Sequence, residues 1–278
     1  MKKLKLELFL QIIGIGSASG LIHKDNMLLV ISDNSGYLYE YSIESDSLSR
    51  SPLFESVVME NIPKQHKTDF EAITYINDTI YIFGSGSTPN RNVMMQLDAN
   101  TKTVLATHDM ADFYAILKSF AQIADADFNI EGAIASENVW YFFQRGNQGN
   151  GKNGIFTVTG DITGLDFSIV YNQYKLPKLG GIETSFTDAT IIDNTIYFLA
   201  TAENTNSAYD DGEVMGSLIG QINIEKMKIG KTRMIPQKLK FEGLTTYDVN
   251  NDTITFLLCD DNDSETLESA VYKLSFQK

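Results

Sequence analysis

The stretch Asp69-Phe70-Glu71-Ala72-Ile73-Thr74 has four counterparts along the chain, and the five copies together decide the fold. Each copy has an oxygen-bearing side chain, then Gly or Ala, then an apolar β-former or Thr. The counterparts are Ala18-Ser19-Gly20-Leu21-Ile22, Asn129-Ile130-Glu131-Gly132-Ala133-Ile134, Phe186-Thr187-Asp188-Ala189-Thr190-Ile191 and Lys240-Phe241-Glu242-Gly243-Leu244-Thr245. A polar turn and a β-rich run follow every copy, so the chain repeats one supersecondary unit.

The spacing of the copies predicts the architecture. With Ser19, Glu71, Glu131, Asp188 and Glu242 as markers, the repeats are 52, 60, 57 and 54 residues long, and the two chain ends together supply a fifth of 55. Several strands in a repeat of about 50 residues are typical of a β-propeller. We therefore expect one all-β domain over residues 1–278, a five-bladed propeller of four-stranded antiparallel blades. The blades are expected around residues 13–60, 61–110, 125–176, 183–236, and 237–278 together with 1–12.

The second repeat shows the expected order of strands. Residues 71–76, 79–84, 93–97 and 103–107 are rich in β-formers, and Asn77-Asp78 is a hairpin signal between the first two. Two strand lengths return the chain to its starting level. The loops after the second strands, among them residues 85–92, 145–153, 201–216 and 260–268, should therefore surround the markers at one end of the channel.

The N-terminal residues are predicted to complete the last blade. Leucines alternate with other residues over 3–12, which is a strand pattern and not the apolar core of a signal peptide. As the outer strand of the blade that holds Glu242, this segment would close the ring and remove free sheet edges. We expect a cytoplasmic protein, with export as the alternative.

One helix is predicted over residues 112–123, where four apolar side chains follow a helical spacing: Phe113, Ile116, Leu117 and Phe120. Such a stripe is typical of a buried face. The helix is expected to cover either one mouth of the channel or a gap between blades.

Composition excludes several functions. The formal net charge of −14 argues against nucleic acid as a partner, because phosphate binding needs a basic surface. One cysteine, Cys259, and three histidines leave no disulfide framework and no Cys/His zinc site. No apolar run approaches the roughly 18 residues that indicate a membrane span.

The marker residues predict a metal site. Innermost strands line the channel of a propeller, so the acids Glu71, Glu131, Asp188 and Glu242 should face one another, with Ser19 beside them. Carboxylates that close require either protonation or a cation between them. An all-oxygen set suits Ca²⁺, and Mg²⁺ less well because it prefers a tight octahedron. The alternative is that these acids bond backbone N–H groups and hold no ion.

The same residues carry a resemblance. Ser19-Gly20-Leu21, Glu71-Ala72, Glu131-Gly132 and Glu242-Gly243, one per blade, are similar to soluble calcium-activated apyrases, as are Asp33-Asn34-Ser35-Gly36-Tyr37-Leu38-Tyr39 and Arg145. The chain also resembles bacterial propellers related to esterase-like phytase domains, whose likeness includes Gly84-Ser85-Gly86-Ser87 and Gln144-Arg145-Gly146-Asn147. The apyrase resemblance implies a Ca²⁺ held by one Ser or Glu from each blade. The fourth blade departs from that pattern, with Asp188 where Ser is expected.

Two functions remain open. In the first, the protein is a metal-dependent hydrolase of a phosphoester or ester. Arg145 would hold an anionic small-molecule substrate, and Asp33, Glu203 or Asp260 would act as general base. In the second, a structural cation ties the strands together and the loops bind a ligand or protein without catalysis. The run Asp260-Asp261-Asn262-Asp263 is interpreted as a solvated acidic loop, because it lacks the glycine and glutamate of a calcium-binding loop.

Overall fold

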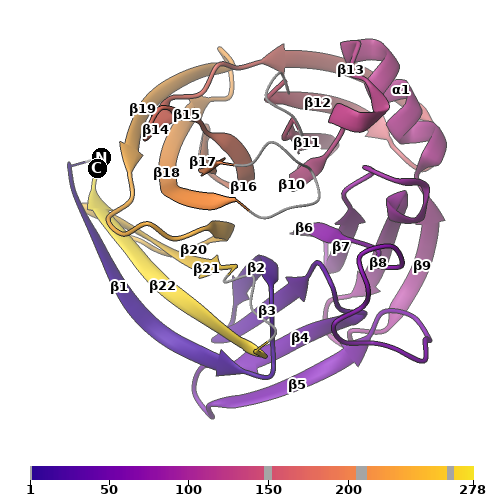
Figure 1. Cartoon of the computed structure of the whole chain (residues 1–278), viewed down its shortest axis with the longest axis horizontal. Coiled ribbons are helices and arrows are strands. Elements are labelled where there is room, and N and C mark those ends of the chain that lie inside the picture. The colour runs from indigo at the N-terminus through magenta and orange to yellow at the C-terminus, as the bar shows by residue number, and fades with distance from the viewer. Residues whose placement is uncertain (1, 147–151, 205–211, 262–265) are drawn as a thin grey trace.

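Five four-stranded antiparallel sheets surround a central axis in the computed structural model (Figure 1). The structure describes residues 2–146, 152–204, 212–261 and 266–278. The prediction of a five-bladed propeller is confirmed. Each blade runs outward from its innermost strand, and the innermost strands contact one another around the axis.

The blades follow one another along the chain. Blade 1 consists of β2 (Ala18–Lys24), β3 (Met27–Ser32), β4 (Tyr37–Ser42) and β5 (Ser47–Pro52). Blade 2 consists of β6 (Phe70–Ile76), β7 (Thr79–Gly84), β8 (Val93–Asp98) and β9 (Val104–Asp109). Blade 3 consists of β10 (Ile130–Ser136), β11 (Val139–Gln144), β12 (Gly154–Asp161) and β13 (Asp166–Gln173). Blade 4 consists of β16 (Ser185–Ile192), β17 (Thr195–Asn204), β18 (Glu213–Asn223) and β19 (Lys228–Met234). Blade 5 consists of β20 (Phe241–Val249), β21 (Thr253–Asp260), β22 (Glu268–Gln277) and β1 (Lys2–Ile13).

The N-terminal strand closes the ring as the sequence predicts. β1 pairs antiparallel with β22, from Lys5 opposite Ser275 to Ile13 opposite Glu268. The two chain ends consequently lie side by side at the rim of the propeller (Figure 1). This pairing gives blade 5 its fourth strand.

The hydrophobic core lies between the blades and is divided into five clusters, one at each interface between neighbours. Strand alternation explains this arrangement, because successive side chains point to the two faces of a blade and both faces are covered. In β11, for example, Phe142 faces blade 2 while Phe143 faces blade 4. The blades therefore stabilise one another.

The helix α1 (Ala111–Ala121) fills a gap between blades, one of the two predicted positions. Phe113, Tyr114 and Leu117 are buried in the cluster shared by blades 2 and 3, and Figure 1 places α1 at the periphery. Half of the predicted stripe is not buried, since Ile116 is 38% and Phe120 54% exposed.

Smaller elements complete the described chain. They are two 3₁₀ turns and one hairpin, namely η1 (Pro89–Arg91), η2 (Asp125–Asp127), β14 (Lys178–Leu179) and β15 (Ile182–Glu183). The loop predicted over residues 201–216 is shorter than expected, because β17 extends to Asn204 and β18 begins at Glu213. Within the described ranges, no helix has the length and apolar character needed to cross a membrane.

Removing one core ring should show how strongly the interfaces between blades hold the fold. Phe142 is fully buried, with its ring 5.2 Å from Phe83 and 5.4 Å from Phe113, centroid to centroid. We expect Phe142→Ala to lower the free energy of unfolding by about 3–5 kcal/mol, because the cavity spans two blades. Urea denaturation measures the change. The control Val170→Ala, at a side chain 57% exposed, should stay within about 0.5 kcal/mol.

Candidate functional site

Every innermost strand begins with a β-bulge at the same end of the axis, which we call the polar end. The strand register skips one residue in each blade, between Ala18 and Gly20 in the first and between Phe70 and Ala72 in the second. The skipped residues are Ser19, Glu71, Glu131, Thr187 and Glu242. A bulge residue is released from the ladder and its side chain is re-aimed. Five polar side chains are thus presented together around the axis.

The fourth marker was therefore misplaced by one residue. The register skips Thr187, so Thr187 and not Asp188 is the counterpart of Glu71. The residue before each bulge is apolar and fully buried, and Phe186 holds that position in blade 4. Asp188 precedes an alanine, as Glu71 does, and this pattern favours Asp188 as the marker. Thr187 follows a buried phenylalanine, as Glu71 does, and the strand register agrees with this second pattern.

Asp188 joins two blades through backbone hydrogen bonds. Its carboxylate accepts the N–H of Ala189 at 2.7 Å and that of Leu244, on the inner strand of blade 5, at 2.6 Å. Gly132 makes room for it, because a Cβ there would lie 3.2 Å from Asp188 Oδ1. Burial raises the pKa of Asp188 well above its usual value, and the two N–H groups oppose that shift. This matches the backbone-bonded alternative considered for the acids.

The two hydroxyl members of the bulge set also bond backbone. Ser19 donates to the carbonyl of Phe70 at 2.5 Å, and Thr187 donates to that of Phe241 at 2.8 Å. Each bond runs from one blade to the residue before the bulge of the next blade. These hydroxyls connect neighbouring inner strands.

The acids of blades 1 and 2 belong to a first ion-pair network. Lys67 contacts Asp33 and lies 2.7 Å from Asp69, and Arg91 lies 2.7 Å from the other oxygen of Asp69. Ser85 donates to that same oxygen of Asp69 at 2.5 Å. Burial lowers the pKa of Lys67, but the charges of Asp33 and Asp69 raise it by more, so the pKa lies above its usual value.

A second network connects blades 3, 4 and 5. Arg145 lies 3.3 Å from Glu131, 3.1 Å from Glu203 and 4.0 Å from Glu242. Lys240 lies 3.1 Å from Glu242 and 2.8 Å from Asp261. Burial lowers the pKa of Arg145, but the three glutamates, Glu131 foremost, raise it above its usual value.

Glu71 stands outside both networks. Among the described residues, no hydrogen bond or ion pair engages its carboxyl group, which is partly buried. Burial raises its pKa well above the usual value, and the charges of Asp69, Glu131, Glu242 and Asp33 raise it further. Glu71 is thus the bulge acid that no protein cation neutralises directly.

The other two bulge acids are shifted in the same direction but are opposed by cations. Burial raises the pKa of Glu131, while Arg145 and Lys240 lower it, and the net shift is upward. For Glu242, burial raises the pKa well above the usual value even though Lys240 lies beside it. The networks therefore only partly offset the cost of burying these carboxylates.

The residues expected to be catalytic lie at the polar end. The guanidinium group of Arg145, which is expected to hold an anionic substrate, lies between carboxylates of three blades. Asp33 contacts Lys67, and Glu203 accepts the N–H of Gly212 at 2.9 Å in addition to its contact with Arg145.

The described part of the acidic run, Asp260 at the end of β21 and the following Asp261, differs from its interpretation as a solvated loop. Asp260 and Asp261 are each only 8% exposed. Asp260 accepts the N–H of Ala270 at 3.0 Å, and burial raises its pKa. Four other residues expected at this end lie outside the described residues: Asn147, Asp210, Asp211 and Asn262.

Sequence reasoning missed three members of the networks, which are Lys67, Asp69 and Lys240. Lys67 and Lys240 precede their bulge acids by four and two residues, and this recurrence of a lysine before an acidic bulge was available as a signal. The loop acids that these lysines contact, Asp33 and Asp261, are brought near by the packing of neighbouring blades, and the sequence repeat does not specify that packing.

The carboxylates close enough to share one cation are Asp33, Asp69 and Glu71, whose ligand oxygens lie within 4.8 Å of one another. This group overlaps the predicted ring only at Glu71. Calcium–oxygen distances of about 2.3–2.6 Å allow one ion to contact three oxygens so spaced. The donor set is compatible with a hard divalent cation, although Lys67 already contacts two of its members.

Fold and site together define a five-bladed propeller with a charged, carboxylate-rich end. The chain belongs to a family of unknown function, DUF6929, whose model matches residues 14–276. No curated protein is significantly similar in sequence. The family and the propeller fold are therefore established, whereas a relation to apyrases or phytase-like domains is not.

Solved structures share the fold at low sequence identity. Myxococcus xanthus glutaminyl cyclase superposes with a TM-score of 0.57 at 8% identity, over 98% of this chain and 97% of its own. The Malassezia sympodialis allergen Mala s 1 superposes with 0.55 at 8% identity, over 95% of each chain. A luciferin-regenerating enzyme gives 0.49 at 9% identity, over 98% and 95%. These likenesses concern the fold alone.

Replacing Arg145, which contacts glutamates of three blades, should show how much free energy the buried carboxylates of the second network cost without it. We expect Arg145→Met to lower the free energy of unfolding at neutral pH by about 3–5 kcal/mol, because Glu131 and Glu203 are left buried without it. The loss should shrink as the pH falls, because protonation removes the negative charge of a buried carboxyl group whose pKa is raised in the folded protein, and the neutral group no longer needs a cation beside it. Urea denaturation between pH 4 and 8 measures this. Arg50→Met, which breaks an exposed pair with Glu60, is the control and should cost at most about 1 kcal/mol.

Neutralising Glu71 should have the opposite effect. Its pKa is raised in the folded protein, so the folded state binds more protons than the unfolded state, and stability is lost as the pH rises through the folded-state pKa. In a buffer that contains a chelator and no divalent cation, we expect Glu71→Gln to raise the melting temperature at pH 8 by a few degrees, about 2–4 °C for each kcal/mol gained. The gain should vanish near pH 4. Exposed Glu44→Gln should show no such pH dependence, and a variant of Glu71 that melts lower at pH 8 would contradict the assignment.

Proposed function

We propose that the protein is a small-molecule hydrolase acting on a phosphoester or ester at the polar end. A divalent cation, with Ca²⁺ preferred over Mg²⁺, would be held there by Asp33, Asp69 and Glu71. The observation that carries the proposal is that these three carboxylates converge while Glu71 forms no ion pair or hydrogen bond with any described residue. Unshared acceptors at a buried site are available to a ligand or ion.

A second acceptor in the group supports this proposal. Asp33 Oδ1 is buried and has no hydrogen-bond partner among the described residues. A cation could therefore engage Asp33 Oδ1 and Glu71 while Lys67 keeps its contact with Asp33 Oδ2. Asp69 would be shared between the ion and Lys67. A bound divalent cation would polarise the ester or phosphoryl oxygen.

The surrounding residues receive distinct roles. Lys67 and Arg91 lie beside the three carboxylates and are the cations nearest to an anionic substrate group docked there. Arg145 fixes Glu131 and Glu203 instead of binding substrate, so it is a positioning residue. Asp33 is committed to the cation, so Glu203 and Asp260 are the acids that we assign to proton transfer. Each accepts one backbone N–H through one carboxylate oxygen.

The resemblance to calcium-activated apyrases and phytase-like domains favours an ester or phosphoester among possible substrates. Glutaminyl cyclase shows that an enzyme can be built on a similar fold. At 8% identity its reaction carries no weight for this chain.

Lys67 favours a second candidate function. Its ammonium group already contacts Asp33 and Asp69 and provides the positive charge that a metal would supply. In that case the polar end would be a non-catalytic binding site without a metal, and the carboxylate of Glu71 would accept a hydrogen bond from an ammonium group of the ligand. The excess of carboxyl groups over cations at this end is compatible with such a ligand.

Cation binding and turnover distinguish the two candidates. We expect isothermal titration calorimetry to show one site for Ca²⁺, with affinity lowered at least tenfold in Glu71→Gln, since the variant removes a charged ligand. Turnover of phosphomonoesters, nucleotides, lactones or aryl esters should require the same cation and be lost in the variant. Glu44→Gln should leave both properties unchanged. Absence of Ca²⁺ and Mg²⁺ binding, or turnover indifferent to a chelator, would sink the metal-dependent proposal and leave the second candidate.

A further inference from the structure

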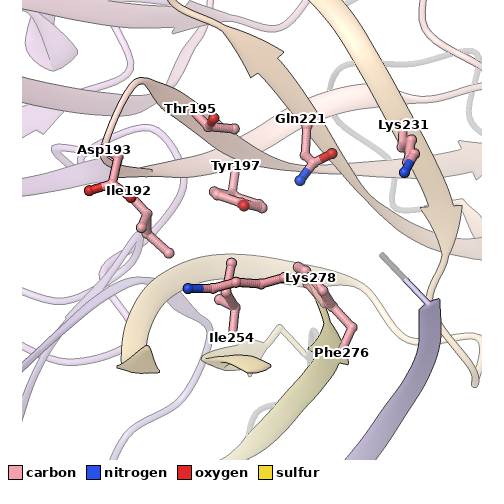
Figure 2. Close-up of a pocket in the computed structure, with 9 residues that line it drawn as sticks. All are labelled: Ile192, Asp193, Thr195, Tyr197, Gln221, Lys231, Ile254, Phe276 and Lys278. Carbon is pink, nitrogen blue, oxygen red and sulfur yellow. The ribbon is translucent and has the colours of Figure 1, made fainter. Parts of the chain in front are cut away.

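A groove opens between blades 4 and 5 at the end of the propeller opposite the polar end (Figure 2). It has a volume of about 280 Å³ and lies beside the hairpin turn that joins β16 to β17, whereas the bulge of β16 is at the strand's other end. Figure 2 shows Tyr197, Gln221 and Lys231 on one side and Ile254, Phe276 and Lys278 on the other.

Two largely buried aromatic rings lie beneath the groove. Tyr197 and Phe276 are 6% and 2% exposed, and their ring centroids lie 6.1 Å apart. Both belong to the hydrophobic cluster between blades 4 and 5, as does Ile254. A flat apolar group in the groove would therefore rest on the end of a packed core, and burial of that surface would favour binding.

The rim of the groove is basic. Lys231 and Lys278 are exposed and form no ion pair with any described residue. Asp193 is the acid that lines the groove, and Figure 2 places it at the end away from Lys231. In a chain of net charge −14, the unpaired Lys231 gives the end of the groove away from Asp193 a local positive charge, whereas the ammonium group of Lys278 lies toward the Asp193 end (Figure 2).

We propose that this groove binds a small anionic molecule with a flat, apolar body, of the aromatic carboxylate class. The apolar body would lie on Tyr197 and Phe276, and the carboxylate would face Lys231. The volume lies at the lower limit of the roughly 300–1,000 Å³ of small-molecule sites, so it favours a ligand of one or two rings over a nucleotide. The site is separate from the polar end and does not depend on the function proposed there.

Two probes of the same shape test the proposal. Isothermal titration calorimetry should show saturable binding of 2-naphthoate, and binding of the neutral 2-naphthamide should be at least fivefold weaker. Lys231→Glu, at an exposed position, should weaken 2-naphthoate at least fivefold and leave 2-naphthamide unchanged. Lys228→Glu is the matched control, because it makes the same charge change on β19 at an exposed residue that does not line the groove. It should leave both affinities unchanged.

Three results would overturn the proposal. The first is the absence of saturable 2-naphthoate binding to the wild-type protein. The second is equal affinity for the acid and the amide. The third is an equal loss of 2-naphthoate binding in Lys228→Glu and Lys231→Glu, which would show that only the overall surface charge matters. Cation binding at the polar end should be unaffected by either lysine variant, so failure of one proposal leaves the other open.

Discussion

Five inner strands converge on one axis, and the side chains released where they begin must be accommodated within a narrow space. The bulges release five polar residues at one end of the axis, and three of these residues are glutamates. Carboxylates that meet in a partly dry environment are costly unless they are paired or protonated. The arrangement of cations, hydroxyls and glycines around the polar end follows from this constraint.

Lysine and arginine side chains of the protein offset much of the free-energy cost of burying these carboxylates. Arg145 links acids of blades 3, 4 and 5, and Lys240 adds a contact to the loop after β21. Lys67 and Arg91 do the same for the acids of blades 1 and 2. These side chains hold neighbouring blades together at the positions where a structural metal was considered. The case for a purely structural cation is correspondingly weaker than the case for a ligand or a catalytic ion.

The repeat was sufficient to predict the fold, because its period, its alternating strands and the N-terminal strand all report local chemistry. It was also sufficient to locate the polar end. It could not specify the register within the fourth blade, where Asp188 and Thr187 both follow Phe186 and both carry oxygen. Lys67 and Lys240 each contact one acid two residues along the chain, but their second partners, Asp33 and Asp261, come from other segments, and no spacing in the sequence reveals these. The carboxylates that Arg145 contacts likewise come from three blades, and the repeat does not specify them.

Glu71 is the feature that packing does not explain. A glutamine at this position would have nearly the same shape and would remove a charge that forms no ion pair with a described residue, so stability alone would favour the amide. Asp188, by contrast, has two N–H partners, and Glu131 and Glu242 each have a cation beside them. Sites that tolerate an unpaired, strongly shifted acid are often functional, because the shift itself is useful for binding or proton transfer. The function of the polar end should therefore be sought at Glu71 first, and the networks on either side interpreted as the scaffold that holds it.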